Sequence, residues 1–163
     1  MSVVDEFVKM AQTEVDNNSV YVWGGQGQKL SSMTFDKIRE METSDENARR
    51  VIQHVADIYL KGIKRAKIFD CSGLVTFLLM RLGVLSYDTT ANGIYKKCRV
   101  ITKKELRPGD LVFKVTDGKA VHVAIYKGDD ILIEAVGRDE GVKNTKLSSK
   151  FNKYGRYSAF DFK

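Results

Sequence analysis

The feature that most constrains the fold is a change in hydrophobic pattern near the middle of the chain. In the first half, apolar residues recur at helical spacing, whereas the second half has short β-prone runs separated by turn signals. The expected helices cover residues 2–15, 34–41, 46–60 and 71–82. The expected strands cover 99–102, 111–116, 121–126, 131–136 and 157–162. Helices followed by hairpin-linked strands predict an α+β fold with an antiparallel sheet.

Two of the expected helices begin with a capping box, formed by Ser2 with Asp5 and by Thr43 with Glu46. The segment 71–82 differs from the others because it is apolar on nearly every side. A helix of that kind is normally buried. The sequence therefore places this helix at the centre of the core.

Size and composition suit one folded domain over residues 1–163. The chain is 43% hydrophobic and 29% charged, as expected of a globular protein. Two Cys and two His are too few for a disulfide scaffold or an evident zinc site, so no metal or cofactor is predicted. The sequence contains no run of 18 apolar residues, so no membrane span is predicted. The N-terminal MSVVDEFVKM has acids where a signal peptide has a basic segment, so no signal peptide is expected.

The net charge of +6 is concentrated at the C-terminal end. From Gly141 onward there are six basic residues and one acidic residue. This segment is either a solvated, lysine-rich surface or a docking patch for an anionic polymer. Its lysines are not interleaved with stacking aromatic residues, so nucleic acid is not an expected partner. The lysines concerned are Lys143, Lys146, Lys150 and Lys153.

Cys71 lies at the expected start of the buried helix. Asp70 before it is a favourable N-cap, which places Cys71 in the first turn. There, unpaired backbone N–H groups and the helix dipole stabilise a thiolate and offer donors to a developing oxyanion. Gly73 is expected to leave space beside the sulfur. Cys71 is therefore either a small core residue or a nucleophile.

His122 and Glu134 lie on two consecutive expected strands. If the connecting loop is 127–129, Tyr126 pairs with Asp130 and His122 pairs with Glu134. Cross-strand partners share a face of the sheet, so the imidazole and the carboxylate would meet. A carboxylate in so apolar a strand needs a partner, and an imidazolium provides one.

Cys71, His122 and Glu134 together supply the nucleophile, base and orienting acid of covalent catalysis. The remaining residues of the same types receive other interpretations. His54 lies at the edge of its helical stripe and is expected to be solvated. Cys98, at a strand start, is expected to be structural.

Four blocks of sequence follow one another in a distinctive order. They are YVWGG at 21–25, DCSGL at 70–74, PGDLVF at 108–113 and HVAIYKG at 122–128. In this order they resemble the NlpC-type cell-wall cysteine peptidases, which are papain-like peptidoglycan hydrolases. The resemblance covers residues 1–27 and about 66–163. It implies a papain-like α+β core, in which N-terminal helices, with the nucleophile at a helix start, pack on a C-terminal antiparallel sheet.

The resemblance also implies roles for individual residues. Cys71 matches the nucleophile and His122 the general base, and the family's third polar position falls at Glu134, where many members carry His, Asn or Gln. In members that cut next to D-glutamate, the matching Tyr, Asp and Ser hold the free amino end of the stem peptide. The resulting substrate-binding candidates are Tyr21, Asp70 and Ser72, with Trp23 of the same block as a fourth.

The segment at about 28–66 departs from the family pattern, which has only a few residues between the first two blocks. It contains two expected helices, and both of its ends attach beside the expected site. We therefore expect it to pack over or next to the cleft, where it either shapes substrate choice or adds a hydrophobic buttress. Inserts here are similar to some phage endolysin catalytic domains, which implies cytoplasmic synthesis and release to the wall by lysis or a holin.

The predicted function is bacteriolytic hydrolysis of peptidoglycan by a thiol protease that cleaves stem-peptide amide bonds through an acyl-enzyme. Two alternatives stay open. One is N-acetylmuramoyl-L-alanine amidase-type cleavage on the same fold, and the other is a catalytically silent wall-binding module. The expected partners are bacterial peptidoglycan and, through the basic C-terminal segment, anionic wall polymers.

Overall fold

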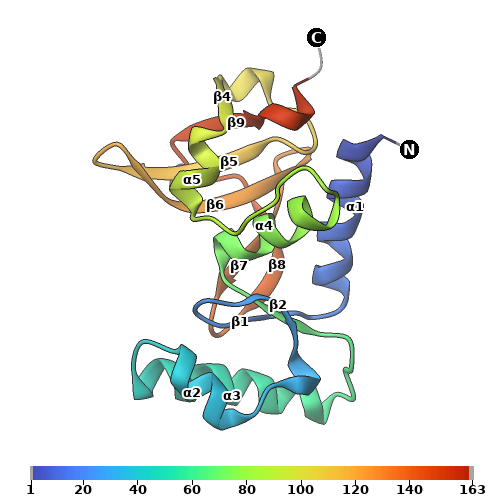
Figure 1. Ribbon diagram of the computed structural model, residues 1–163, viewed down its shortest axis with the longest axis vertical. Helices are drawn as coiled ribbons and strands as arrows, with labels where there is room; N and C mark the ends of the chain where they lie inside the picture. Colours follow the sequence, from blue (N-terminus) through green and yellow to red (C-terminus); the bar gives the residue numbers. More distant parts are fainter. Residues whose placement is uncertain (1, 162–163) are drawn as a thin grey trace.

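The computed structural model describes residues 2–161, and its helices precede most of its strands, as predicted (Figure 1). The helices are α1 (Val3–Asp16), α2 (Phe35–Met41), α3 (Asp45–Leu60), α4 (Cys71–Arg81) and α5 (Ala91–Lys96). The strands are β1 (Val20–Tyr21), β2 (Gln26–Lys29), β3 (Lys67–Phe69), β4 (Cys98–Ile101), β5 (Leu111–Thr116), β6 (Lys119–Gly128), β7 (Ile131–Gly137), β8 (Gly141–Lys146) and β9 (Lys153–Tyr157). Among the described residues, no helix is both long and apolar enough to cross a bilayer.

The larger sheet has the strand order β4-β9-β5-β6-β7-β8, and each of its pairings is antiparallel. Helices α1, α4 and α5 pack with it to form the main hydrophobic core. Leu74, Val75, Leu78 and Leu79 of α4 are almost fully buried there. The predicted α+β architecture, with a central apolar helix against an antiparallel sheet, is confirmed.

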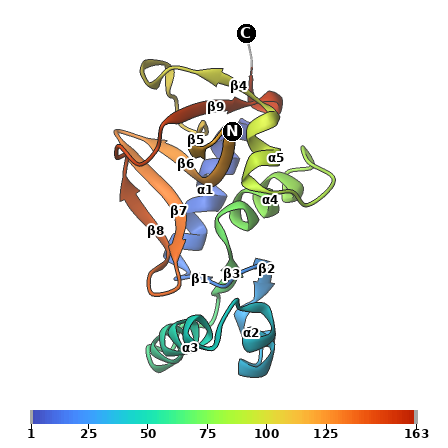
Figure 2. The same cartoon turned by 90° about the vertical axis from the view of Figure 1, so that its left-hand side faces the viewer.

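A smaller sheet, of order β1-β3-β2, carries the inserted helices. Gln26 pairs with Phe69 and Lys29 with Lys67, so the two ends of the 28–66 segment lie side by side. Helices α2 and α3 lie on the far side of this small sheet from the larger one (Figures 1 and 2). They build a second hydrophobic cluster with β1 and β3, formed by Val20, Val22, Leu30, Ile38, Val51, Val55, Ile58, Ala66 and Ile68.

The helix starts follow the expected capping chemistry with one correction. The box of Ser2 and Asp5 is present at α1. At α3 the cap is Ser44, whose hydroxyl accepts the backbone N–H of Asn47 at 3.1 Å, and the predicted Thr43–Glu46 box is wrong. Thr43 instead accepts the side-chain amide of Asn47 at 2.9 Å.

The register predicted for the β6–β7 hairpin is wrong by two residues. Tyr126 pairs with Leu132 rather than with Asp130. The turn contains only Asp129 and Asp130, whose φ angles of 53° and 59° suit a tight type I′ turn. A shift of two residues, unlike a shift of one, leaves each side chain on its face of the sheet.

The last strand also differs from its predicted position. The prediction placed this strand at 157–162, but β9 covers Lys153–Tyr157 and ends where the predicted strand begins. Residues 158–160 form a 3₁₀ turn instead. Phe160 in that turn packs on Phe7 of α1, with ring centroids 5.1 Å apart. The turn therefore closes the core against α1, and Phe162 of the predicted strand lies outside the described residues.

Candidate active site

A cleft of about 310 Å³ opens where the start of α4 meets β6. Its walls are formed by Tyr21, Trp23, Asp70, Cys71, Ser72, Thr90, Ala91, Ala120, Val121 and His122. Six of the seven predicted site residues thus line one cleft. The seventh, Glu134, is buried beside His122.

Asp70 organises the start of α4. One oxygen, Oδ1, accepts the N–H of Gly73 at 2.6 Å, and the other, Oδ2, accepts the N–H of Gly24 at 3.0 Å. Burial raises the pKa of Asp70, while these two hydrogen bonds and that from Ser72 oppose the rise. Within the described chain, this cap leaves the first-turn N–H groups of Cys71 and Ser72 available to a substrate oxygen.

Two glycines let the first two sequence blocks press together. A Cβ at Gly73 would overlap the carbonyl oxygen of Gly25, and a Cβ at Gly25 would lie 2.7 Å from the backbone nitrogen of Phe69. Through this close approach the N–H of Asp70 donates to Gly25 at 3.0 Å. The space at Gly73, predicted to lie beside the sulfur, is therefore filled by the backbone of the YVWGG block.

Glu134 holds the ring of His122. Nε2 of His122 lies 2.8 Å from Oε1 of Glu134, whose side chain is 2% exposed. Burial raises the pKa of Glu134, but hydrogen bonds from His122 and Thr145 outweigh it and lower that pKa. The predicted pairing is therefore present, although the cross-strand register behind it was wrong.

The other side of the His122 ring is turned to Cys71. Burial lowers the pKa of His122, but the interactions with Cys71 and Glu134 outweigh that effect and raise the pKa to about 9. Because Nε2 is engaged by Glu134, Nδ1 is the nitrogen left for the thiol. This raised pKa favours the imidazolium form of His122 beside Cys71 at neutral pH.

The sequence did not single out Thr145 or the position of Lys150. Thr145 donates its hydroxyl to Oε2 of Glu134 at 2.5 Å, and Nζ of Lys150 lies 3.6 Å from Oε1. The Phe151 ring packs on His122, with centroids 5.7 Å apart. All three belong to the C-terminal segment that the sequence marked only by its charge, so no local signal connected them with the site.

The substrate-binding candidates differ in how freely they meet the cleft. Trp23 is 52% exposed. Ser72 donates its hydroxyl to Asp70 at 3.3 Å. Tyr21 is covered on one side by Arg138, whose guanidinium carbon lies 5.4 Å from the ring centroid. Burial, followed by the charges of Cys71 and Asp70, raises the pKa of Tyr21 to about 12.

Cys98 and His54 were predicted to lie outside the catalytic site, as a structural and a solvated residue, and the prediction for His54 is wrong. Cys98 fits its structural role, since burial raises its pKa to about 12 and Sγ contacts the carbonyl oxygen of Ile94 at 3.4 Å. His54 is half-buried rather than solvated. Its Nδ1 is buried without a hydrogen-bond partner among the described residues, because α3 packs this ring close to Gly141.

Parts of the chain are similar to two curated proteins. The probable endopeptidase p60 of Listeria welshimeri is 32% identical over 103 residues, which cover 63% of this chain and 19% of that protein. Murein DD-endopeptidase MepH of Escherichia coli K12 is 36% identical over 87 residues, covering 51% of this chain and 32% of that one. The chain therefore spans a third or less of these two curated relatives.

A solved structure shares the whole fold. The P60 domain of antigen MAP1204 from M. avium subspecies paratuberculosis aligns with 99% of this chain and 100% of its own, at a TM-score of 0.63 and 19% identity. The model of the NlpC/P60 family matches residues 18–159, which contain both the cleft and the buried Glu134. This chain belongs to the NlpC/P60 family.

Proposed function

We propose that this chain is a peptidoglycan hydrolase, a cysteine endopeptidase that cleaves amide bonds of the stem peptide. The observation that carries the proposal is the chain of side-chain contacts from Cys71 through His122 to Glu134. Cys71 stands at the N-terminus of α4 beside His122, and the buried Glu134 holds the far nitrogen of that ring at 2.8 Å. This is the relation of nucleophile, base and orienting group that acyl transfer requires.

The reaction proceeds in two steps. The thiolate of Cys71 attacks the amide carbon and forms a C–S bond, while the carbonyl oxygen gains charge near the N–H groups of Cys71 and Ser72. When the resulting tetrahedral intermediate collapses, the C–N bond breaks and the leaving nitrogen takes the proton from Nδ1 of His122. Water then gives a proton to Nδ1 and its oxygen attacks the acyl carbon. The C–S bond breaks, and the thiolate–imidazolium pair is restored.

The substrate class is supported by the relatives. The p60 protein is named a probable endopeptidase and MepH a murein DD-endopeptidase. These names support the proposal through the stretches of 103 and 87 residues in which the two proteins are similar to this chain. A role as a silent wall-binding module would not need a buried carboxylate that keeps His122 protonated.

Digestion of purified peptidoglycan, with mass spectrometry of the soluble fragments, tests the proposal. An endopeptidase releases fragments with new amino groups on stem-peptide residues. Sugar chains freed of whole stems would show amidase cleavage instead. No soluble fragments with the wild type would contradict the proposal. Cys98→Ala is the matched control for Cys71→Ala, because it removes the chain's other thiol, which is structural.

The basic C-terminal segment supports an additional contact with anionic wall polymers. Its lysines are exposed on β8, on β9 and in the loop between them. We expect Cys71→Ala protein to bind walls that retain anionic polymers more tightly than stripped walls, with the difference falling as salt rises. The difference should shrink in Lys143/Lys146/Lys153→Gln but persist in the matched triple Lys29/Lys37/Lys61→Gln. Equal binding to both walls would contradict this contact.

A further inference from the structure

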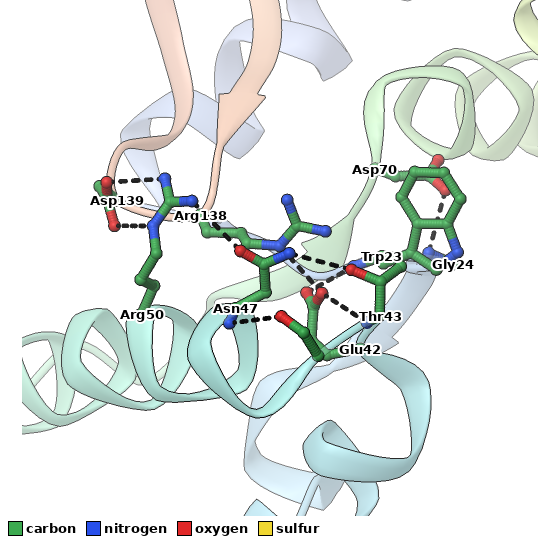
Figure 3. Close-up of polar contacts among 10 residues, drawn as sticks. Trp23, Gly24, Glu42, Thr43, Asn47, Arg50, Asp70, Arg138 and Asp139 are labelled. Carbon is green, nitrogen blue, oxygen red and sulfur yellow. Dashed lines mark hydrogen bonds and ion pairs between the residues drawn. The ribbon is translucent and has the colours of Figure 1, made fainter.

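A buried carboxylate of the insert reaches the rim of the cleft. Glu42 follows the last residue of α2, and its side chain is fully buried. Its Oε2 accepts the backbone N–H of Trp23 at 3.0 Å, and its Oε1 accepts Nε–H of Arg138 at 2.9 Å. Glu42 therefore ties the Trp23 loop to the turn between β7 and β8 (Figure 3).

Arg138 carries this link to the cleft. Its guanidinium lies over the Tyr21 ring, and Tyr21 lines the cleft together with Cys71. The Arg138 side chain is 16% exposed. Contact with Glu42 on one edge and with Tyr21 on one face restricts the guanidinium plane, so its remaining donors have a defined direction.

Those remaining donors are not used within the described part of the chain. Among residues 2–161, only Nε of Arg138 has a hydrogen bond, and the terminal groups Nη1 and Nη2 have no acceptor there. Figure 3 shows them turned away from Glu42, into the space between the hairpin turn and the loop of Trp23 and Gly24. Two parallel N–H groups on a planar fork match a carboxylate.

A neighbouring ion pair between the insert and the same turn serves as a structural comparison. Arg50 of α3 binds Asp139 through both Nε and Nη2, at 3.0 and 2.8 Å. Both arms of that arginine are used on the protein (Figure 3). Arg138, one residue before Asp139, donates only from Nε to the described part of the chain, and its guanidinium lies over Tyr21, which lines the cleft. The two arginines therefore differ in what they leave available to a ligand.

We propose that Arg138 binds a free carboxylate of the stem peptide close to the scissile amide, and that Glu42 of the insert positions it. The inference rests on the proposed function and adds a substrate feature to it. Stem peptides carry carboxylates, and in amidated walls a carboxamide replaces one of them. A carboxamide lacks the charge and one of the two acceptors, so the enzyme should discriminate between the two forms. The insert thereby contributes to substrate choice.

Two synthetic stem peptides that differ only in carboxylate or carboxamide at the D-glutamate position test the inference. The wild type should cleave the carboxylate form with a kcat/KM about 10- to 100-fold higher, the range expected for hydrogen bonds to a charged group. In Arg138→Gln the two values should agree within about threefold, and Arg138→Lys should restore part of the difference. Arg50→Gln, which removes the neighbouring clamp, should keep the wild-type ratio.

Glu42→Gln tests positioning, because its amide oxygen can still accept the Trp23 N–H. It should raise KM for the carboxylate peptide and reduce the discrimination, with kcat nearly unchanged. Binding of both peptides to Cys71→Ala and Cys71→Ala/Arg138→Gln protein, by calorimetry, gives the ratio without turnover. Equal cleavage of both peptides by the wild type would overturn the inference, as would an equal loss on both in Arg138→Gln. Absence of any cleavage by the wild type would instead overturn the proposed function.

Discussion

Nε2 of His122 lies 2.8 Å from Oε1 of Glu134, a carboxylate almost fully withdrawn from water. Such a carboxylate depends on protein donors to stay charged. Here they are His122, the hydroxyl of Thr145 and, at 3.6 Å, the ammonium of Lys150. The pair fixes the ring with its second nitrogen available to Cys71.

Glu134→Gln should lower the pKa of His122 from about 9, because an amide stabilises the imidazolium less than a carboxylate does. The amide can still orient the ring, so kcat/KM should fall by roughly 10- to 100-fold, short of the full contribution of a general base. NMR titration of the His122 ring and peptide kinetics check the two effects. Thr145→Val, which removes one donor to Glu134, serves as a milder comparison. An unchanged pKa with full activity would contradict the role given to Glu134.

The two cysteines should differ sharply toward alkylation. Cys71 lines the cleft, whereas burial raises the pKa of Cys98 to about 12. In native protein at neutral pH, iodoacetamide should modify Cys71 alone, and Cys98 should react only after denaturation. Peptide mapping by mass spectrometry checks this. Equal labelling of both thiols in the folded protein would contradict it.

His54 should make the fold less stable in mild acid. Burial, followed by the charge of Lys143, lowers its pKa below 6.5, so the unfolded chain takes up the proton first. Stability is therefore lost as pH falls from about 6.5 toward the folded pKa. Lys61 adds to the lowering, and Asp57 and Asp139 oppose it.

The measurement is urea unfolding at pH 7 and pH 5 for the wild type and His54→Leu. The variant should lose less stability between these pH values. His122, whose pKa is raised to about 9, gains stability over this range as the unfolded chain takes up its proton, but it is present in both proteins and its contribution cancels in the comparison. An identical loss in both proteins would show that His54 is not the responsible group.

Arg156 and Asp110 explain the PGD block as a structural feature. Nε and Nη2 of Arg156 each lie 2.8 Å from a carboxylate oxygen of Asp110, and both side chains are buried. Arg156→Ala leaves that carboxylate without its partner and should cost about 3–5 kcal/mol in the free energy of unfolding. Urea unfolding measures the cost. Arg156→Met/Asp110→Leu should cost less than the single change, and an equal or greater cost would contradict the ion-pair explanation.

The features that the sequence predicted well are local. The N-cap role of Asp70 and the burial of α4 depend on residues a few positions apart, so spacing alone indicated them. The cluster of Cys71, His122 and Glu134 was predictable because a carboxylate in an apolar strand needs a polar partner, and the neighbouring strand offers His122. A register error of two residues did not disturb it, since face alternates with period two.

The features that it missed depend on distant partners. Strand β8 is largely polar at an exposed edge, and its Lys143 and Thr145 pair with β7 across a turn, so no alternation marked it. Glu42 and Arg138 lie 96 residues apart in sequence and meet only because the insert folds beneath the small sheet. Neither stands in a motif, and each looks like an ordinary surface charge when read alone.

In the proposed mechanism the thiol of Cys71 performs the chemistry. Its most direct test is the initial rate at which Cys71→Ala hydrolyses a stem peptide, measured against the wild type and Cys98→Ala, with the melting temperature as a check on folding. We expect a loss of about 10⁴-fold or more in Cys71→Ala, as for removal of a covalent nucleophile, and a near wild-type rate in Cys98→Ala. A folded Cys71→Ala protein that works within tenfold of the wild-type rate would contradict it.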